Sequence, residues 1–416
     1  MIDTRFIREQ PELVVQKAKQ KGYDIDIARL VEMESKRATL VPKIENLQSE
    51  RNTLARKGKS GNPHPEDIQR GKQIKSELTK LERELEPINK EYFKALGEIP
   101  NVFPDDTPLG GEENNREEKK WGDTALKNFK VVDHLTWGEQ RGLIDFERGT
   151  KVAGAKFYFT KGSLVELEIA ILQFGLKLAK EHGFIPMLVP HLVNSRIIDG
   201  AGFTAKSDAE RQIYKVEDED LNLIATAEIP MTGYHADEIL AEDDLPKLYA
   251  GYSPAYRVEA GAYGKHSKGL YRVHQFNKLE LYVFCKPQES EQWHQKMVAL
   301  EEDLCQKLEI PYRLVRIAAG DLGAPAYKKY DVEYWSPVDK NYRELMSCSN
   351  VTDYQARRLN IRYKSLERIK YVHTLNGTAA AMSRMPIAII ENFQTADGKV
   401  HVPEALQAYM AGSTEI

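Results

Sequence analysis

The stretch RVHQFNKLELYVF, from Arg272 to Phe284, has the pattern of a β-strand, because it is short, rich in aromatic and aliphatic residues, and alternates with a period of two. One face becomes apolar toward its end, as a core face does, and carries Leu279, Leu281 and Val283. The other face mixes charges with aromatic rings: Arg272, His274, Phe276, Lys278, Glu280, Tyr282 and Phe284. The strand alone is compatible with a charged outer surface or with the floor of a binding site.

A second predicted strand, AGYSPAYRVEA (Ala250–Ala260), precedes the first and predicts a long hairpin. Arg257 and Glu259 alternate on one face of this strand. If the two mixed faces coincide, the charges form either cross-strand ion pairs worth a few tenths of a kcal/mol or a site. The loop between the strands, GAYGKHSKGLY, contains three Gly, two Lys and one His. Such a loop suits a phosphate backbone as well as an ordinary hairpin tip.

At 416 residues the chain is too long for one ordinary core, so we expect two or more domains. The composition is 41% hydrophobic and 29% charged with a net charge of −4, typical of a globular protein. No apolar run approaches the about 18 residues needed to span a membrane, and the N-terminus, MIDTRFIREQPELVVQKAK, has no apolar signal core. The three cysteines lie far apart, which predicts neither a disulfide framework nor a zinc site and favours a reducing cytoplasm.

The first hundred residues contain two heptad-like apolar seams separated by a break, KGKSGNPHPED. They predict an antiparallel helical hairpin or coiled coil with arms of roughly 40 Å, in which Pro42 and Pro87 are expected to cause kinks. The two seams are Leu30, Met33, Leu40, Ile44, Leu47, Leu54, and then Ile74, Leu78, Leu81, Leu85, Ile88, Tyr92, Ala95. Residues 28–97 carry 15 Lys and Arg against 11 Asp and Glu, in a chain of net charge −4. These charges fit a solvated helix face or an arm that contacts a polyanion.

The remainder predicts a linker at residues 101–123, rich in Pro, Gly and acidic residues, and then an α+β domain over residues 124–416 with a mainly antiparallel sheet flanked by helices. A helix is expected at Ser163–His182, with Ser163 as N-cap and Glu166 completing a capping box. Further predicted elements are a short strand in FIPMLVP, a helix at Gln288–Leu308, and strands at Leu223–Thr226, Lys247–Val258, Tyr312–Arg316, Tyr330–Trp335 and Arg343–Ser347.

The segment NGTAAAMSRMPIAIIENFQ predicts a turn at Asn-Gly followed by an Ala-rich helix. The start of such a helix presents free N–H groups to anions. Arg384 would lie about two turns inside the helix, and it gains significance if its guanidinium reaches the charged sheet face.

Together these segments resemble the three motifs of class II aminoacyl-tRNA synthetases. HGFIPMLVP with Pro190 resembles motif 1, YRVE with RVHQFNKLE resembles motif 2, and NGTAAAMSR resembles motif 3. More narrowly, TAE (Thr226–Glu228), ELMSCSNVTDYQARR, HTLNGT and the N-terminal hairpin resemble the seryl-tRNA synthetase family over nearly the whole chain. The resemblance implies a helical tRNA-binding arm (1–100), a linker (101–123) and a class II catalytic domain (124–416).

The family makes seryl-adenylate from serine and ATP and transfers the seryl group to tRNA. The resemblance therefore implies an AMP-forming serine–tRNA ligase acting on L-serine and tRNA(Ser), with tRNA(Sec) as a further candidate. It also implies Mg²⁺ as cofactor, the cytoplasm as location and a homodimer formed through motif 1. Arg257 would grip the α-phosphate and Arg384 the γ-phosphate, with Phe276 stacked on the adenine.

The remaining implied roles are these: Arg257, Arg384 and Glu344 as catalytic residues; Thr226, Ala227, Glu228, Glu280, Asn376 and Thr378 around serine; Arg257, Val258, Glu259, Arg272, Val273, Phe276, Glu344, Leu345, Met346, Ser347 and Arg384 around ATP; and Glu344 and Ser347 at the metal.

The residue types suit this chemistry. The serine carboxylate attacks phosphorus directly, so the protein needs positioned charges rather than a nucleophile. Arginine offers planar, permanently charged donors to phosphate, and carboxylates suit magnesium.

The chain also departs from the family pattern. Met346 stands where a serine is usual, which puts one polar contact near ATP in doubt, and Ala379 and Ser383 replace common glycines of motif 3. The loop Gly200–Tyr214 is longer than expected and is a candidate lid over the serine site. A catalytically silent paralogue is disfavoured by the intact charged residues, and a class II enzyme for another amino acid by the hydroxyl-suited TAE and NGT segments.

Overall fold

The computed structural model describes residues 1–59, 61, 64–203, 212–259, 268–366 and 368–416. It contains two compact units, Met1–Pro100 and Asn101–Ile416. In the first unit, the short helices α1 (Thr4–Glu9) and α2 (Pro11–Gln20) precede two long ones, α3 (Ile27–Lys59) and α4 (Pro65–Glu98). No helix in the described part of the chain is long and apolar enough to cross a membrane.

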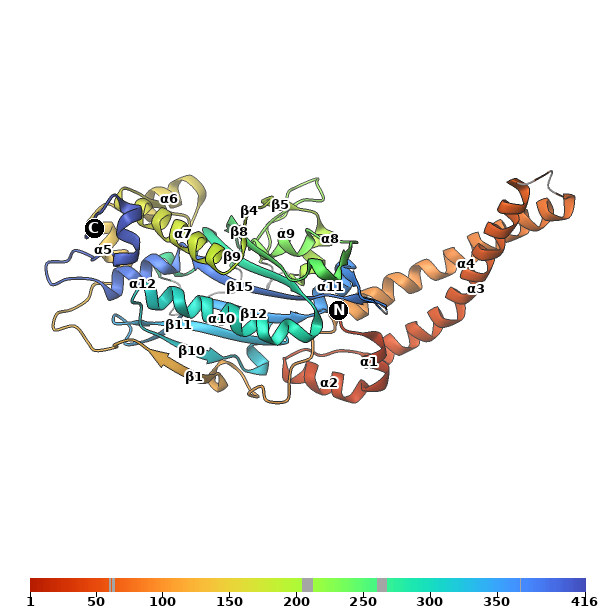
Figure 1. Cartoon of the computed structure of the whole chain (residues 1–416), viewed down its shortest axis with the longest axis horizontal. Helices are drawn as coiled ribbons and strands as arrows, with labels where there is room; N and C mark the ends of the chain where they lie inside the picture. The colour runs from red at the N-terminus through yellow and green to blue at the C-terminus, as the bar shows by residue number, and fades with distance from the viewer. Residues whose placement is uncertain (60, 62–63, 204–211, 260–267, 367) are drawn as a thin grey trace. The chain divides into compact units, whose positions relative to one another are not determined.

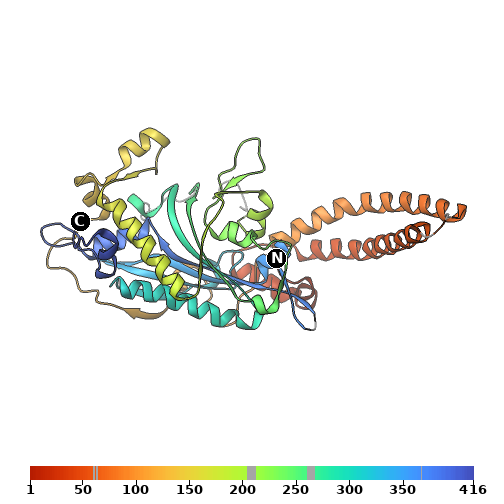
Figure 2. The same cartoon turned by 45° about the horizontal axis from the view of Figure 1, so that its top comes forward.

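The predicted helical hairpin is confirmed, because α3 and α4 run side by side (Figures 1 and 2). Ile44, Ile74 and Leu78 are buried between them, as the heptad seams require. Polar contacts flank this seam: Arg70 donates two hydrogen bonds of 2.8 Å to the Glu50 carboxylate. Helix α3 continues through Pro42 and helix α4 through Pro87 without interruption.

The second unit is built on one eight-stranded sheet with the order β1-β10-β11-β12-β15-β9-β8-β4 (Figure 1). All neighbours are antiparallel except β4 and β8, which confirms the expected mainly antiparallel sheet. The strand bounds are β1 Arg116–Trp121, β4 Ile185–Leu188, β8 Lys247–Tyr256, β9 Gln275–Cys285, β10 Tyr312–Arg316, β11 Lys328–Ser336, β12 Asn341–Thr352 and β15 His373–Ala381.

Residues 101–123 differ from the linker that we expected, because they belong to the second unit and contain β1. All six residues of β1 are exposed, so no apolar alternation marks the strand in the sequence. It is an edge strand held by backbone pairing with β10 and by Trp121, whose ring stacks on Tyr312 at a centroid distance of 5.9 Å.

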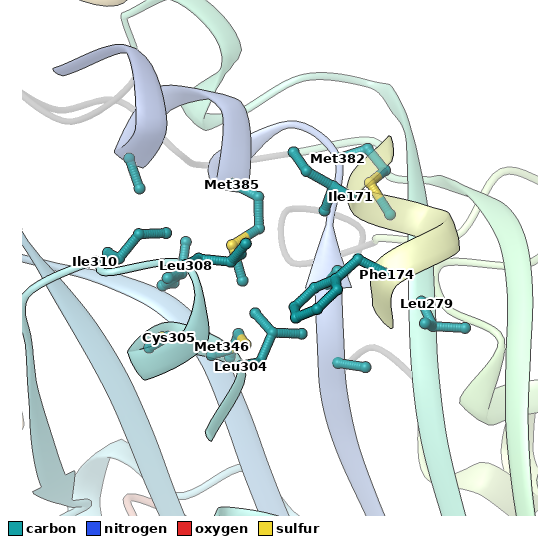
Figure 3. Packing of buried hydrophobic residues seen from close by; sticks show 14 of the residues in the cluster. Ile171, Phe174, Leu279, Leu304, Cys305, Leu308, Ile310, Met346, Met382 and Met385 are labelled. Atoms are coloured by element: carbon teal, nitrogen blue, oxygen red, sulfur yellow. The ribbon is translucent and has the colours of Figure 1, made fainter. Parts of the chain in front are cut away.

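Helices α7 (Ser163–Glu181), α10 (Ser290–Lys307) and α12 (Arg384–Asn392) pack on one face of the sheet and form the main core. Figure 3 shows Phe174, Leu304 and Met385 meeting in this core. The capping box predicted for α7 is wrong: Ser163 is the first helical residue, and Gly162 is the N-cap without a side-chain hydrogen bond. The chain enters α7 with a φ of +57° at position 162, which glycine adopts without strain.

The predicted alternation of β9 is confirmed. Leu279, Leu281 and Val283 lie in the main core. Tyr282 and Phe284, on the opposite face, lie in a second core, to which α8 (Ser195–Ala201), α9 (Glu228–Gly233) and α11 (Tyr354–Leu359) contribute. The first half of that opposite face, with Phe276 and Glu280, remains for the site described below.

The prediction for the segment that begins at Asn376 is corrected. Asn376 and Gly377 lie inside β15 rather than in a turn, and α12 begins at Arg384, so this arginine is the first helical residue and not two turns in. The turn signal fails because Gly377 has a packing reason: a Cβ there would lie 2.9 Å from Glu301 Oε1 and 3.0 Å from Met297 Cε. Tertiary packing thus outweighs the local preference of Asn-Gly.

Candidate active site

The β8–β9 hairpin places the motif 2 side chains around one opening. The Arg257 N–H donates to the His274 carbonyl at 2.9 Å, which extends the hairpin pairing beyond β8. The Arg257 guanidinium carbon lies 5.2 Å from the centroid of the Phe276 ring. Arg272 precedes β9 rather than belonging to it, and its guanidinium pairs with Glu259 at 3.2 Å.

A pocket with about 460 Å³ of empty space lies where the ends of β9, β12, β15 and α12 meet. Its lining includes nine of the residues predicted for the site: Arg257, Glu259, Val273, Phe276, Glu344, Leu345, Ser347, Thr378 and Arg384. Tyr271, Lys278, Ala381 and Ser383 complete the lining. The mixed face of the hairpin therefore lines a concave site, which decides between the two alternatives that the sequence leaves open.

Two arginines give the pocket its positive charge. Arg384 binds the Glu344 carboxylate at 3.1 Å, and its guanidinium carbon lies 5.7 Å from the Tyr271 ring centroid. Burial lowers the pKa of Arg257, and the nearby positive charge of Arg384 lowers it further. Two cations held close enough to disfavour one another form a site that an anion would stabilise.

Glu344 supplies a permanent negative charge beside the arginines. Burial opposes ionisation of this carboxyl, but the charges of Arg384 and Lys329 outweigh burial and lower its pKa to about 2. Glu344 and Ser347 both line the pocket from β12 and offer hard oxygen ligands. The described residues contain no group of three or more His, Cys, Asp and Glu side chains arranged for a metal ion. The two oxygen donors of Glu344 and Ser347 nevertheless fit magnesium, which commonly takes one or two protein oxygens and completes its shell with phosphate and water.

The residues predicted for serine binding form a buried hydrogen-bond network. The Glu228 carboxylate accepts from Gln355 at 2.8 Å and from Asn376 at 3.0 Å. Gln355 in turn accepts from the hydroxyls of Tyr282 and Thr374, at 2.7 and 2.8 Å. Burial raises the pKa of Glu228 to about 7, although the Gln355 hydrogen bond opposes that rise. Gln355 thus orients the carboxylate of Glu228, which was predicted for the site, whereas no role was predicted for Gln355 itself.

Lys278 is a second residue that sequence reasoning missed. It lines the pocket from β9, is 7% exposed, and its ammonium contacts the Glu280 carboxylate. Burial lowers the pKa of Lys278 to about 7, and the charge of Arg257 acts in the same direction. The sequence places Lys278 on the mixed face of the strand, two residues before Glu280. It gave no reason to select this residue, because a lysine on a strand face is normally exposed to solvent.

Other predicted residues lie elsewhere. Met346 packs in the main core on the opposite side of the sheet (Figure 3). Its side chain therefore replaces no polar contact in the pocket, and any role in ATP binding would fall to its backbone. Val258 is absent from the pocket lining, and Thr226 accepts a hydrogen bond from the Glu228 N–H at 3.3 Å. Residues 204–211 of the candidate lid and 261–267 of the hairpin loop lie outside the described residues.

A second hollow, with about 920 Å³ of empty space, shares Phe276 with the first. Its walls include Phe157, Phe159 and Glu168, from the segment before and within α7, and Gln275 of β9. Phe276 is thus accessible from two sides, as suits a ring on which a planar base can stack.

Comparison with known proteins supplies the family. Residues 1–103 match the model of the seryl-tRNA synthetase N-terminal domain, and residues 214–393 match the tRNA synthetase class II core domain (G, H, P, S and T). The chain belongs to the seryl-tRNA synthetase family. The predicted family, the fold class and the enzyme class of serine–tRNA ligase are thereby confirmed.

Relatives align over the full length. The serine–tRNA ligase of Dictyoglomus turgidum is 45% identical over 100% of this chain and 99% of that protein, and that of Nitrosopumilus maritimus is 40% identical over 100% of both. The crystal structure of Pyrococcus horikoshii seryl-tRNA synthetase complexed with ATP has a TM-score of 0.87 and 40% identity, covering 100% of this chain and 99% of that chain. A cytoplasmic serine–tRNA ligase of Naegleria fowleri, solved with AMP, has a TM-score of 0.82 at 31% identity, with coverage of 98% and 95%.

Proposed function

We propose that this synthetase activates L-serine with ATP at the Arg257–Arg384 pocket and transfers the seryl group to tRNA(Ser). The observation that carries the proposal is the position of two half-buried arginines beside Phe276, together with the buried carboxylates of Glu228 and Glu280. Related enzymes were solved with ATP and with AMP, which supports nucleotide binding in this pocket.

In the first step, a carboxylate oxygen of serine forms a bond to the α-phosphorus of ATP, and the bond from that phosphorus to pyrophosphate breaks. Arg257 donates to the α-phosphate and stabilises the charge that develops on its oxygens, while Arg384 binds the γ-phosphate. Phe276 stacks on the adenine, and Glu259 accepts from its amino group. Glu344 and Ser347 would hold Mg²⁺, which supplies charge neutralisation to the phosphates when bound.

For the amino acid, we propose that Glu228 and Glu280 bind the ammonium and hydroxyl of serine, with Thr226, Asn376 and Thr378 completing the site. A site that hydrogen-bonds a hydroxyl should reject alanine by a factor on the order of 10⁴. In the second step, a ribose hydroxyl of the terminal tRNA nucleotide attacks the seryl carbonyl, and AMP leaves.

The test is exchange of labelled pyrophosphate into ATP by the purified protein with magnesium, in the presence of each of the twenty amino acids. We expect exchange with serine. Absence of exchange would refute the activity, and exchange with threonine or proline instead would assign a different substrate.

We further propose that α3 and α4 form an arm that contacts tRNA. The support is the match of residues 1–103 to the family's N-terminal domain and the excess of basic residues over residues 28–97. Deleting Ala28–Gly97 should leave serine-dependent exchange intact and abolish most tRNA charging. Unchanged charging of tRNA(Ser) would contradict the proposal, and tRNA(Sec) can be compared in the same assay.

We also propose a cytoplasmic homodimer formed through motif 1. Apolar side chains stand exposed along α7, β4 and the following strand: Ile169 (47%), Ile185 (58%), Leu188 (83%) and Leu192 (41%). Exposed apolar side chains in such number are typical of a surface that another subunit covers. Sedimentation equilibrium should give twice the mass of one chain, and a Leu188→Glu variant should sediment as the monomer. A monomeric wild-type protein would contradict this.

A further inference from the structure

The underside of the sheet, opposite the pocket, contains a buried acid that neither the family's motifs nor the pocket accounts for. Glu301 of α10 is 0% exposed, and neither of its carboxyl oxygens makes a hydrogen bond of normal geometry within the described residues. Buried polar groups are nearly always hydrogen-bonded, so an exception calls for an explanation. An apolar side chain would be the less costly choice at this position of the core.

Glu301 lies beneath the point where two strands of the site separate. The last paired residues of β12 and β15 at that end are Cys348 and Gly377, and beyond them the strands diverge to make room for the pocket. An added Cβ at Gly377 would lie 2.9 Å from Glu301 Oε1 and 3.4 Å from Cys348 Sγ. The Glu301 carboxyl therefore occupies the space under this divergence, and Gly377 leaves room for it.

The next residue of β15 is Thr378, whose side chain lines the pocket. Its pairing with β9 is irregular, because Thr378 faces Glu280 and Ala380 faces Leu279, so that Ala379 is an extra residue that forms a bulge. The bulge sets the direction in which Thr378 projects. The backbone N–H of Thr378 acts on the Glu301 carboxyl and lowers its pKa, against the larger effect of burial.

We propose that Glu301 is a positioning residue for serine recognition: its carboxyl supports the β15 bulge from below and thereby fixes Thr378 against the substrate. Burial raises the pKa of Glu301 well above its ordinary value, and the charge of Asp331 adds to this effect. Both effects favour the neutral acid, whose carboxyl oxygen can accept from the Thr378 N–H without placing a bare charge in the core. The inference rests on the proposed function only in taking Thr378 as a serine-binding residue.

The experiment compares four single variants and one double variant by serine-dependent pyrophosphate exchange, with KM measured separately for serine and for ATP. Glu301→Asp keeps the acid but shortens its reach by one methylene, and should raise the serine KM about ten-fold with the ATP KM changed less than two-fold. Glu301→Gln keeps length, donor and acceptor, and should change the serine KM less than three-fold. Glu302→Asp is the matched control on the same helix, because Glu302 binds Lys119 and Tyr312 away from the pocket, and it should leave both constants unchanged.

Thr378→Ala separates the two proposals. If it leaves the serine KM unchanged, the proposed role of Thr378 fails. If it raises the serine KM while Glu301→Asp does not, the inference about Glu301 alone is overturned. In the double variant Glu301→Asp/Thr378→Ala, the increase in the serine KM should be smaller than the product of the two single increases, because both changes act on one contact. An increase equal to that product would also overturn the inference about Glu301. Equal increases of both KM values in Glu301→Asp would indicate general structural damage and refute a positioning role.

Discussion

Replacing Gln355 by methionine tests the buried network that orients Glu228. The Gln355 side chain makes four hydrogen bonds: it donates to Glu228 at 2.8 Å and to the Ala201 carbonyl at 3.0 Å, and accepts from Tyr282 and Thr374 at 2.7 and 2.8 Å. Methionine has a similar length and volume but no amide. Each neutral bond contributes about 1 kcal/mol and the bond to the carboxylate about 2 kcal/mol, so we expect a loss of about 3–5 kcal/mol in the free energy of unfolding.

The same variant should shift the pH dependence of serine binding. Burial raises the pKa of Glu228 to about 7 in the wild type, and the Gln355 hydrogen bond holds it below the value that burial alone would give. Because the serine ammonium needs an ionised carboxylate, serine affinity should rise as the pH increases through this pKa. Without Gln355 the pKa is higher, so the rise should occur at higher pH.

Urea denaturation measures the first effect, and the serine KM in the exchange assay between pH 6 and 9 measures the second. Lys278 titrates in the same range, so the quantity to compare is the difference between variant and wild type. Gln306→Met is the matched control: Gln306 donates one bond of 2.8 Å to Tyr312, away from the pocket, and its loss should cost about 1 kcal/mol with no change in the pH profile. A Gln355→Met protein with the wild-type urea midpoint and the wild-type pH profile would refute the reasoning.

Phe276→Ala should raise the KM for ATP about ten-fold or more, since stacking on a base contributes about 1–3 kcal/mol; an ATP KM within two-fold of wild type would contradict the stacking role. Lys278→Met leaves the buried Glu280 carboxylate without its cation and should lower the free energy of unfolding by about 3 kcal/mol in urea titrations. A variant as stable as wild type would show that the pair is dispensable for folding. One residue inserted after Asn277 should abolish exchange and lower the free energy of unfolding, because it turns both faces of the rest of β9 to the wrong side of the sheet; an active insertion variant would mean that the register is not fixed.

The hairpin and the helical arm could be predicted because their physics is local. Residues that alternate along β9 must face opposite sides of a sheet, and the heptad seams of α3 and α4 need only each other as partners. Arg257, Glu344 and Arg384 were predicted through the resemblance of their segments to the family motifs, because the residues alone left a charged surface and a site equally open.

What failed depended on contacts between distant segments. Strand β1 forms through backbone pairing with a strand nearly two hundred residues later, and its exposed side chains carry no pattern. Gly377 suggests a turn when read alone, and its reason appears only with Glu301 of α10 beneath it. Gln355 is polar on an ordinary helix until the fold places it against Glu228.

The two faces of β9 separate folding from chemistry within a single run of residues. Leu279, Leu281 and Val283 contact the helices of the main core, whereas Phe276, Lys278 and Glu280 lie at the site. Saturation mutagenesis of this strand, scored once for protein abundance and once for growth dependent on the enzyme, should therefore give two interleaved profiles. Leu279, Leu281 and Val283 should be intolerant in both scores, while Phe276 should tolerate substitution for abundance alone. Tyr282 and Phe284, which lie in the second core, should be as intolerant in the abundance score as the residues of the first core.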